Sequence, residues 1–267
     1  MKIFRDPSKL QKWCRARKLA GAKIALVPTM GYLHEGHMSL IKAAKRRGAD
    51  EIVVSVFVNP VQFGPNEDYE KYPRDEKADL AKCVACGATA VFFPTPANMY
   101  LDRHSVYVTE EDLSKGLCGA RRPGHFRGVC TVVAKLFNLA HPDFAVFGQK
   151  DYQQVQVIRR MVRDLNFDLK IVMAPIVREK SGLAKSSRNT YLSPAERETA
   201  VAISRSLKGF KTLAGLRSSL EKAGLKVDYV ECVDAETLEP RKTPKKGCCV
   251  LVAVYCGKTR LIDNRVL

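Results

Sequence analysis

The sequence predicts an α/β protein whose first and larger part is built on a parallel sheet. Strand-like apolar runs recur at 24–27, 52–58, 90–93, 144–147 and 169–173, with helical patterns between most of them. These runs are apolar on both faces, as expected for strands that helices cover on both sides. The length of 267 residues suffices for a second, smaller domain as well.

The order of the remaining elements supports a boundary near residue 175. Helices are predicted at 37–47, 74–86, 129–139 and 152–166, and Pro175 ends the last strand of the series. After Ser193-Pro194 the pattern changes to helices at 195–213 and 216–223, followed by strands at 227–233 and 248–255. We therefore expect one domain over residues 1–175 and a smaller α+β domain over residues 176–267.

Composition and charge limit the classes of protein and of partner. Hydrophobic residues make up 46% and charged residues 27% of the chain, which excludes wholesale disorder. No apolar run reaches the roughly 18 to 20 residues that span a bilayer, and the N-terminus lacks a signal-peptide core, so we expect a soluble cytoplasmic protein without a membrane partner. The net charge of +17 favours anionic partners, nucleotides and phosphorylated substrates among them.

Two features that suggest other functions have simpler interpretations. The basic cluster at 241–246 lacks interleaved aromatic residues, so we interpret it as a solvated loop and expect no nucleic-acid partner. The nine cysteines are an odd number scattered among predicted strands and helices, which favours reduced thiols. Cys83 and Cys86 have the spacing of a zinc or redox pair, but no second pair accompanies them and their surroundings are helical.

The segment from Val27 to Met38 is the strongest indication of a binding site. It places His34 and His37 three residues apart, where an apolar strand turns into a helix. A helix N-terminus offers unpaired N–H groups and a partial positive charge, and Gly31 and Gly36 let the backbone approach a ligand closely. The histidines could ligate a metal, but no third ligand lies nearby in the sequence, so a phosphate site is the stronger interpretation.

Three further loops follow predicted strands, at 59–64, 148–151 and 182–189. Because ligands of parallel sheets gather at the carboxyl ends of the strands, we expect these loops to converge on one cleft. Lys150 is suited to phosphate and Asp151 to ribose hydroxyls, although Asp151 could simply cap a helix. The run Lys185-Ser186-Ser187-Arg188 sets two hydroxyls between two cations, as a triphosphate requires, or forms an ordinary loop before a helix cap.

Other polar residues add weaker indications. Gln62 and Gln154 are neutral amides that suit a hydroxy-acid or a carboxylate. Asp75 and Asp79 lie four apart on a predicted helix, where they could reach Mg²⁺ or face solvent, and we favour the solvent-facing interpretation.

Taken together, the motifs resemble those of the pantothenate synthetase (pantoate–β-alanine ligase) family. The resemblance extends in order over nearly the whole chain and rests on the segments 27–37, 57–63, 72–74, 122–129, 147–154, 186–189 and 260–264. It implies a nucleotidyltransferase with the His-x-Gly-His signature, a Rossmann-like doubly wound N-terminal domain, a smaller C-terminal lid domain and a homodimer.

The resemblance also implies the reaction. Pantoate would attack the α-phosphate of Mg·ATP to give an enzyme-bound pantoyl adenylate and pyrophosphate. The amine of β-alanine would then displace AMP to give pantothenate, a precursor of coenzyme A. Positioning and charge stabilisation would dominate both steps, since neither needs a protein nucleophile.

Residue roles follow from the same resemblance. His37 would be the proton donor, with His34, Lys150 and Arg188 as further catalytic groups. Gln62 would contact pantoate and β-alanine, Gln154 would contact pantoate, and Asp79 is the candidate Mg²⁺ ligand. The implied ATP site comprises Met30, Gly31, Tyr32, Leu33, His34, Glu35, Gly36, His37, Gly148, Gln149, Lys150, Asp151, Val177, Lys185, Ser186, Ser187 and Arg188.

The chain departs from the family pattern at two places. It has Ser181 and Lys185 where the family has Asp and Met or Leu, and the acidic cluster after Arg74 is reduced to Asp75, Glu76 and Asp79. The first alternative function is another His-x-Gly-His nucleotidyltransferase acting on a phosphorylated acceptor, against which the neutral Gln62 and Gln154 argue. The second is a basic nucleotide- or RNA-binding protein without catalysis, which the retained histidines, Lys150 and Arg188 disfavour.

Overall fold

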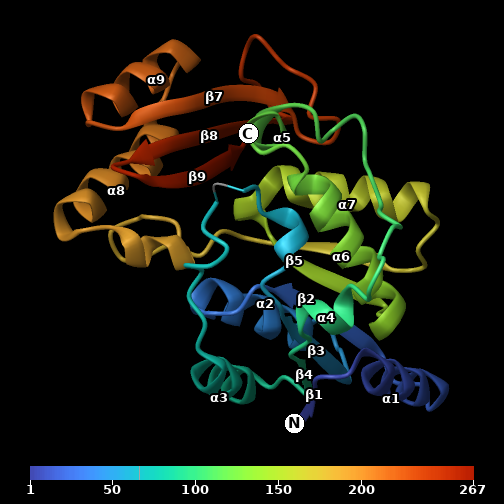
Figure 1. Cartoon of the computed structure of the whole chain (residues 1–267). Coiled ribbons are helices and arrows are strands. Elements are labelled where there is room, and N and C mark those ends of the chain that lie inside the picture. The colour runs from blue at the N-terminus through green and yellow to red at the C-terminus, as the bar shows by residue number, and fades with distance from the viewer. Residues whose placement is uncertain (66) are drawn as a thin grey trace. The chain divides into compact units, whose positions relative to one another are not determined.

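The computed structural model describes residues 1–65 and 67–267 and divides them into two compact units. The first, here the N-terminal unit, comprises Met1–Gly148 and Val157–Ala174. The second, the C-terminal unit, comprises Pro175–Leu267 together with the short segment Gln149–Gln156. Figure 1 labels the elements of both units, and each unit is described by itself.

A six-stranded parallel sheet forms the centre of the N-terminal unit, which confirms the predicted fold class. Its order is β1-β4-β3-β2-β5-β6, and every strand pairing in it is parallel. The order reverses between β2 and β5, the point at which sheets of this kind bind ligands outside the carboxyl ends of the strands. The strands are β1 (Lys2–Phe4), β2 (Ile24–Thr29), β3 (Glu51–Val56), β4 (Ala90–Phe92), β5 (Phe144–Gly148) and β6 (Lys170–Ala174).

Helices lie against this sheet and between its strands in the chain. Apolar residues of α2 and α3 form one core with the strands, and α1 packs against α6. All four helices predicted for residues 1–175 are present. The helices are α1 (Pro7–Leu19), α2 (Glu35–Arg46), α3 (Glu76–Cys86), α4 (Pro96–Met99), α5 (Leu117–Arg121) and α6 (His125–Ala140), with a 3₁₀ turn η1 (Pro60–Gln62). Helix α7 (Tyr152–Asp164) starts in the C-terminal unit and belongs to this unit from Val157 on.

The cysteines of α3 belong to the hydrophobic core. Cys83 and Cys86 are buried against the strands, and burial raises the pKa of the Cys83 thiol to about 12. All nine cysteines of the chain are free thiols. The structure thus places both cysteines at core positions of a helix and does not arrange them as a zinc or redox pair.

The C-terminal unit joins helices to a small antiparallel sheet. The sheet has the order β7-β8-β9, and residues of α8 and α9 share a hydrophobic core with it. The predicted helix at 195–213 ends earlier, because Phe210 is extended and Thr212 caps the next helix. The elements are η2 (Gln149–Asp151), η3 (Ser187–Tyr191), α8 (Pro194–Gly209), α9 (Leu213–Lys222), β7 (Lys226–Asp234), β8 (Cys248–Cys256) and β9 (Thr259–Val266).

Candidate active site

The two histidines occupy the turn between β2 and α2. Gly31 (φ +86°) and Tyr32 (φ +49°) both have left-handed backbone conformations, and His34 is the N-cap of α2. His34 Nδ1 accepts the Gly36 N–H at 3.1 Å, and His37 Nδ1 accepts the His34 N–H at 3.3 Å. The two ring centroids are 4.1 Å apart. Sequence and structure therefore agree that this pair lies at a helix N-terminus.

This capping arrangement assigns the tautomer of both rings. An imidazole that accepts a hydrogen bond at Nδ1 carries the proton of its neutral form on Nε2. His34 and His37 each use Nδ1 in this way. Both Nε2 atoms are therefore donors, the form that can hydrogen-bond to a phosphate oxygen or give it a proton.

Asp79 of α3 holds the same turn from within the N-terminal unit. Its Oδ2 accepts the Tyr32 N–H at 2.8 Å and its Oδ1 accepts the Leu33 N–H at 2.6 Å, while Lys82 Nζ donates to Leu33 O at 2.7 Å. A Cβ on Gly31 would lie 2.9 Å from Val56 Cγ1 and 3.1 Å from Asp79 Oδ2. The close fit of the backbone to β3 and α3, together with the left-handed φ, explains the glycine at this position.

The position of Asp79 corrects one expectation. Its side chain is buried, with the residue 1% exposed, so the solvent-facing interpretation is wrong. Burial raises the pKa of the Asp79 carboxyl, and the hydrogen bonds from Leu33 and Tyr32 oppose that shift. Among residues 1–65 and 67–267 no group of three or more His, Cys, Asp or Glu side chains could hold a metal ion.

Gln62 lies against the histidine turn through Met30. Gln62 Nε2 donates to Met30 Sδ at 3.1 Å, and Gln62 Oε1 accepts from Asn59 Nδ2 at 3.1 Å. Asn59 in turn accepts from the Tyr100 hydroxyl at 2.7 Å, and burial raises the pKa of Tyr100. The structure thus brings together two loops that the sequence placed after neighbouring strands.

Helix α6 supports Gln62 through a close backbone contact. A Cβ on Gly128 would lie 2.5 Å from Gln62 Cα and from Val61 O, so only glycine allows this approach. Gly128 O also accepts from Asn59 Nδ2 at 3.1 Å. Asn59 and Tyr100 carried no predicted role. The available signal for Asn59 was that it is a polar residue directly after the predicted strand at 52–58.

The half-buried guanidinium of Arg122 is linked to Gln62 through His125. His125 Nδ1 is 2.9 Å from Gln62 O, and its Nε2 is 3.0 Å from Arg122 Nη1. Arg122 also binds the Glu67 carboxylate at 2.5 and 2.7 Å. Burial alone would raise the pKa of Glu67, but the hydrogen bond and charge of Arg122 outweigh it and lower the pKa. The segment 122–129, for which no residue role was predicted, is therefore part of the surroundings of Gln62.

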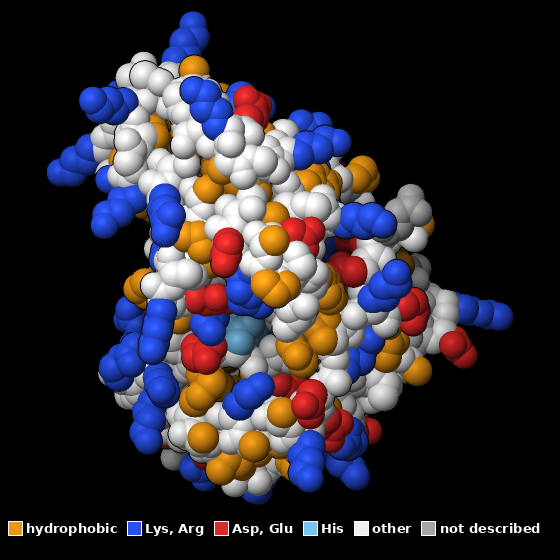
Figure 2. Space-filling model, turned by 90° about the vertical axis from the view of Figure 1, so that its left-hand side faces the viewer, with side chains coloured by type: hydrophobic (Ala, Val, Ile, Leu, Met, Phe, Trp, Pro, Cys, Tyr) orange, Lys and Arg blue, Asp and Glu red, His pale blue; other side chains and the backbone are white. Residues whose placement is uncertain are grey.

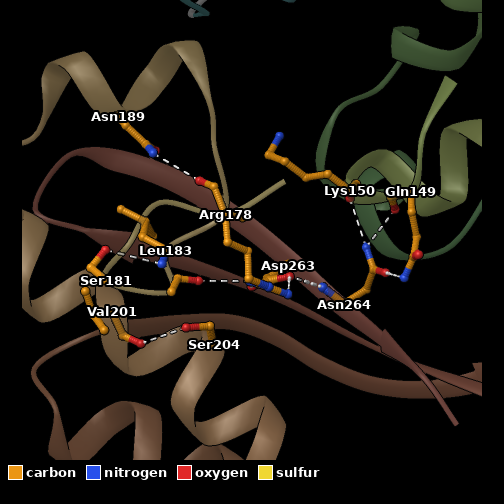
Figure 3. A network of polar contacts seen from close by, with 12 residues as sticks. Gln149, Lys150, Arg178, Ser181, Leu183, Asn189, Val201, Ser204, Asp263 and Asn264 are labelled. Carbon is orange, nitrogen blue, oxygen red and sulfur yellow. Dashed lines mark hydrogen bonds and ion pairs between the residues drawn. The ribbon is translucent and has the colours of Figure 1, made fainter. Parts of the chain in front are cut away.

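In the C-terminal unit, the turn Gln149–Asp151 is anchored to β9. Gln149 Nε2 donates to Asn264 Oδ1 at 3.1 Å, and Lys150 Nζ lies 3.7 Å from Asp151 Oδ1. Figure 3 shows the Lys150 side chain pointing away from Asn264. Gln154 follows in the first turn of α7 and is half-buried.

The serine-rich loop of the C-terminal unit, residues 185–188, follows a short hairpin. Val177 O accepts the Lys185 N–H at 2.9 Å, and Arg178 pairs with Ala184. Ser186 Oγ then accepts the Arg188 N–H at 3.3 Å, as the cap of η3. Within this unit the structure therefore brings Val177 to Lys185 at the start of the predicted loop.

Asn189 braces the end of this loop. It is 3% exposed, and its Nδ2 donates to Ala184 O and to Glu179 Oε1, both at 3.0 Å. Arg197 binds the same Glu179 carboxylate at 3.0 Å and donates to Asn189 O at 2.8 Å. The backbone of 184–189 is thus held by buried polar contacts.

Figure 2 shows where positively charged side chains lie on one face of the molecule. On the face shown in Figure 2, Lys and Arg side chains are distributed widely instead of gathering in one patch. No helix within residues 1–65 and 67–267 is long and apolar enough to cross a membrane.

The chain is similar to known proteins over its whole length. The profile of the family described as pantoate–β-alanine ligase matches residues 2–266. A pantothenate synthetase of Myxococcus xanthus strain DK1622 is 51% identical, over 99% of this chain and 96% of the relative. One of Anaeromyxobacter dehalogenans strain 2CP-C is 53% identical, over 98% of this chain and 97% of the relative.

Solved structures agree with this assignment. Pantothenate synthetase of Thermus thermophilus superposes with a TM-score of 0.90 at 42% identity, covering 99% of both chains. Pantoate–β-alanine ligase of Francisella tularensis, solved in complex with β-γ ATP and β-alanine, gives a TM-score of 0.88 at 35% identity, covering 100% of this chain and 97% of the other. The chain therefore belongs to the pantoate–β-alanine ligase family.

Proposed function

We propose that this enzyme condenses pantoate with β-alanine at the expense of ATP, through an enzyme-bound pantoyl adenylate. The products are pantothenate, AMP and pyrophosphate. Membership of the ligase family supports the reaction, and the capped pair His34 and His37 is the observation that carries the mechanism. Their Nε2–H donors stand at a helix N-terminus, which suits the phosphates of a nucleotide.

In the first step, a pantoate carboxylate oxygen attacks the α-phosphorus of ATP, and the bond from that phosphorus to pyrophosphate breaks. Negative charge grows on the phosphate oxygens, so the donors His34 and His37 stabilise the transition state, with His37 as the proton donor. Lys150 and Arg188 supply positive charge. The residues 30–37, 148–151, Val177 and 185–188 bind ATP.

In the second step, the β-alanine amine attacks the adenylate carbonyl carbon and AMP leaves with the electron pair of the C–O bond. The amine nitrogen gives up its proton as the amide forms. Gln62 contacts both acid substrates, and Gln154 contacts pantoate. A neutral amide suits a hydroxy-acid because it offers both a donor and an acceptor without adding charge. The side-chain hydrogen bond from Asn59 and the close backbone approach of Gly128 keep Gln62 in one place.

Magnesium enters this scheme as part of the Mg·ATP substrate. Both Asp79 oxygens already accept backbone N–H groups, and the described residues offer no group of three metal-binding side chains. Mg²⁺ bound to nucleotide phosphates keeps several waters and needs only one or two protein carboxylates. Because both Asp79 oxygens are occupied, Asp79 shapes the turn and the phosphate oxygens of ATP hold the ion, and the effect of replacing Asp79 on the Mg²⁺ requirement is the test.

Pantoate-dependent exchange of labelled pyrophosphate into ATP, without β-alanine, tests the proposal. The reversible first step predicts exchange with pantoate alone. Exchange that occurs only with a phosphorylated acceptor would instead identify a different nucleotidyltransferase. Such an enzyme needs cations at the acceptor, where this chain has Gln62 and Gln154.

We also propose a homodimer in the cytoplasm. Family resemblance supports the dimer, and the need for ATP supports the location. Light scattering coupled to size-exclusion chromatography distinguishes the mass of a dimer from the 29.8 kDa of one chain. A monomer that is fully active would contradict this part of the proposal.

A further inference from the structure

Asn264 near the end of β9 is a buried amide whose side chain binds one turn. The residue is 3% exposed. Its Nδ2 donates to Gln149 O at 2.9 Å and to Lys150 O at 3.0 Å, and its Oδ1 accepts from Gln149 Nε2 at 3.1 Å. Figure 3 shows these three bonds converging on the Asn264 amide. The side chain therefore fixes the backbone of the turn that carries Lys150.

Asp263, the preceding residue, does the same for the hairpin before the serine-rich loop. It is also 3% exposed, and its carboxylate accepts from Arg178 Nη1 at 2.6 Å and from Arg178 Nη2 at 3.0 Å. Arg178 Nη1 also donates to Gly182 O at 3.2 Å. Because Arg178 pairs with Ala184, the ion pair fixes the strand that leads into Lys185.

Through Asp263 and Asn264, strand β9 therefore binds both the hairpin that carries Arg178 and the turn 149–151. Neighbouring residues of a strand point to opposite faces, so Asp263 and Asn264 are placed to serve different segments. Their backbones are held by β8, where Val252 pairs with Asp263 and Leu251 with Asn264. Asp263 Oδ1 also accepts the backbone N–H of Asn264 at 2.8 Å, which ties the Asp263 side chain to the backbone of its neighbour.

We infer that Asp263 and Asn264 are positioning residues that hold the turn 149–151 and the loop 182–188 in fixed register for ATP. The inference rests on the proposed function, which makes both segments part of the ATP site. A buried polar pair in a strand is costly unless its groups are satisfied, and here the partners belong to substrate-binding segments. This gives the motif 260–264 a role in catalysis without contact to substrate.

The experiment compares variants of β9. Asn264→Ala removes all three bonds to the turn, and Asn264→Asp keeps the size while setting a charged oxygen against two carbonyls. Arg265→Ala is the matched control, because Arg265 donates to Leu207 O at 3.0 Å and to Lys208 O at 2.7 Å, at the end of α8. We expect both Asn264 variants to raise the KM for ATP about tenfold and to lower exchange by a factor of roughly 10 to 100, since small misplacements of catalytic groups cost that much. Arg265→Ala should stay within about twofold of the wild type.

Amide hydrogen exchange provides the readout that does not depend on activity. Faster exchange of residues 148–152 in Asn264→Ala, but not in Arg265→Ala, would support positioning even if the wild type lacked pantoate-dependent activity. A wild type that lacks pantoate-dependent activity would overturn the proposed function but not the positioning role. Equal exchange and equal KM in the Asn264 and Arg265 variants would overturn the positioning role. If Asn264→Ala fails to fold, the isosteric Asn264→Asp decides by the same two measurements.

Asp263 is tested through its partner. Arg178→Lys keeps the charge but loses the two parallel bonds to the carboxylate. We expect faster amide exchange over 182–188 and a raised KM for ATP, with the turn 148–152 less affected than in Asn264→Ala. Unchanged exchange over 182–188 would remove Asp263 from the inference.

Discussion

The Asp79 carboxylate accepts the Leu33 N–H at 2.6 Å, and through this bond helix α3 sets the shape of the turn that carries His34 and His37. The turn needs such support because Gly31 and Tyr32 both have positive φ, a conformation that costs free energy at a residue other than glycine. The acid lies 46 residues further along the chain, so the geometry of the histidines depends on the packing of α3.

Replacing Asp79 by Ala should therefore reduce both stability and activity. The buried N–H of Leu33 and the half-buried N–H of Tyr32 lose their acceptor, which destabilises the fold by about 1–3 kcal/mol in denaturant-induced unfolding. Asp75→Asn is the control, since Asp75 is exposed and an Asn also caps a helix. Equal unfolding free energies of Asp79→Ala and the control would contradict this role.

The isosteric Asp79→Asn separates turn shaping from metal binding. It keeps one acceptor oxygen but turns an amide N–H toward a backbone N–H, so we expect pyrophosphate exchange to fall. The Mg²⁺ concentration for half-maximal exchange should change less than about twofold at saturating ATP, because the phosphate oxygens of ATP hold the ion. A large increase in that concentration would instead identify Asp79 as a metal ligand.

His37→Ala should lower pantoate-dependent exchange by roughly 10²-fold or more, because a donor to the transition-state phosphate is lost. His141→Asn is the control, since His141 is exposed at the end of α6 and asparagine tolerates its positive φ. Both variants should bind pantoate similarly. Undiminished exchange in His37→Ala would exclude this residue from the mechanism.

Gly128→Ala should impair the use of pantoate. The added Cβ would meet Gln62 Cα and Val61 O at 2.5 Å and so displace the turn η1, at an overpacking cost of about 1–3 kcal/mol. We expect a raised KM for pantoate in the exchange assay. Gly209→Ala, whose Cβ would meet no atom within 4 Å, should leave that KM unchanged. A normal KM in Gly128→Ala would show that Gln62 does not need this contact.

Asp234 makes the stability of the C-terminal unit depend on pH. Hydrogen bonds from Thr237 and Glu236, followed by that from Arg241, lower its pKa to about 2. Since the folded-state pKa lies below the ordinary value near 4, the stabilisation is present above that value and is lost as the pH falls toward 2. Unfolding followed between about pH 4 and 2 should be more pH-dependent in the wild type than in Asp234→Asn. Parallel curves would contradict the assignment.

The sequence predicted the elements that hydrophobic periodicity marks. The strands at 24–27 and 144–147 were evident because they are continuously apolar, and the histidine turn because two glycines and a strand end accompany it. The strand β9 was not predicted, since its buried Asp263 and Asn264 interrupt the apolar pattern. Burial of Asp79 was likewise missed, because a helix pattern does not reveal that a distant turn supplies two N–H groups.

Transfer of isotope from pantoate to AMP tests the central claim most directly. With both carboxylate oxygens of pantoate labelled with ¹⁸O, one oxygen bonds to the α-phosphorus in the first step and leaves with AMP in the second. The adenylate mechanism therefore predicts AMP that carries one ¹⁸O and pantothenate that keeps the other in its amide carbonyl. Label found in inorganic phosphate or pyrophosphate, with none in AMP, would contradict the adenylate.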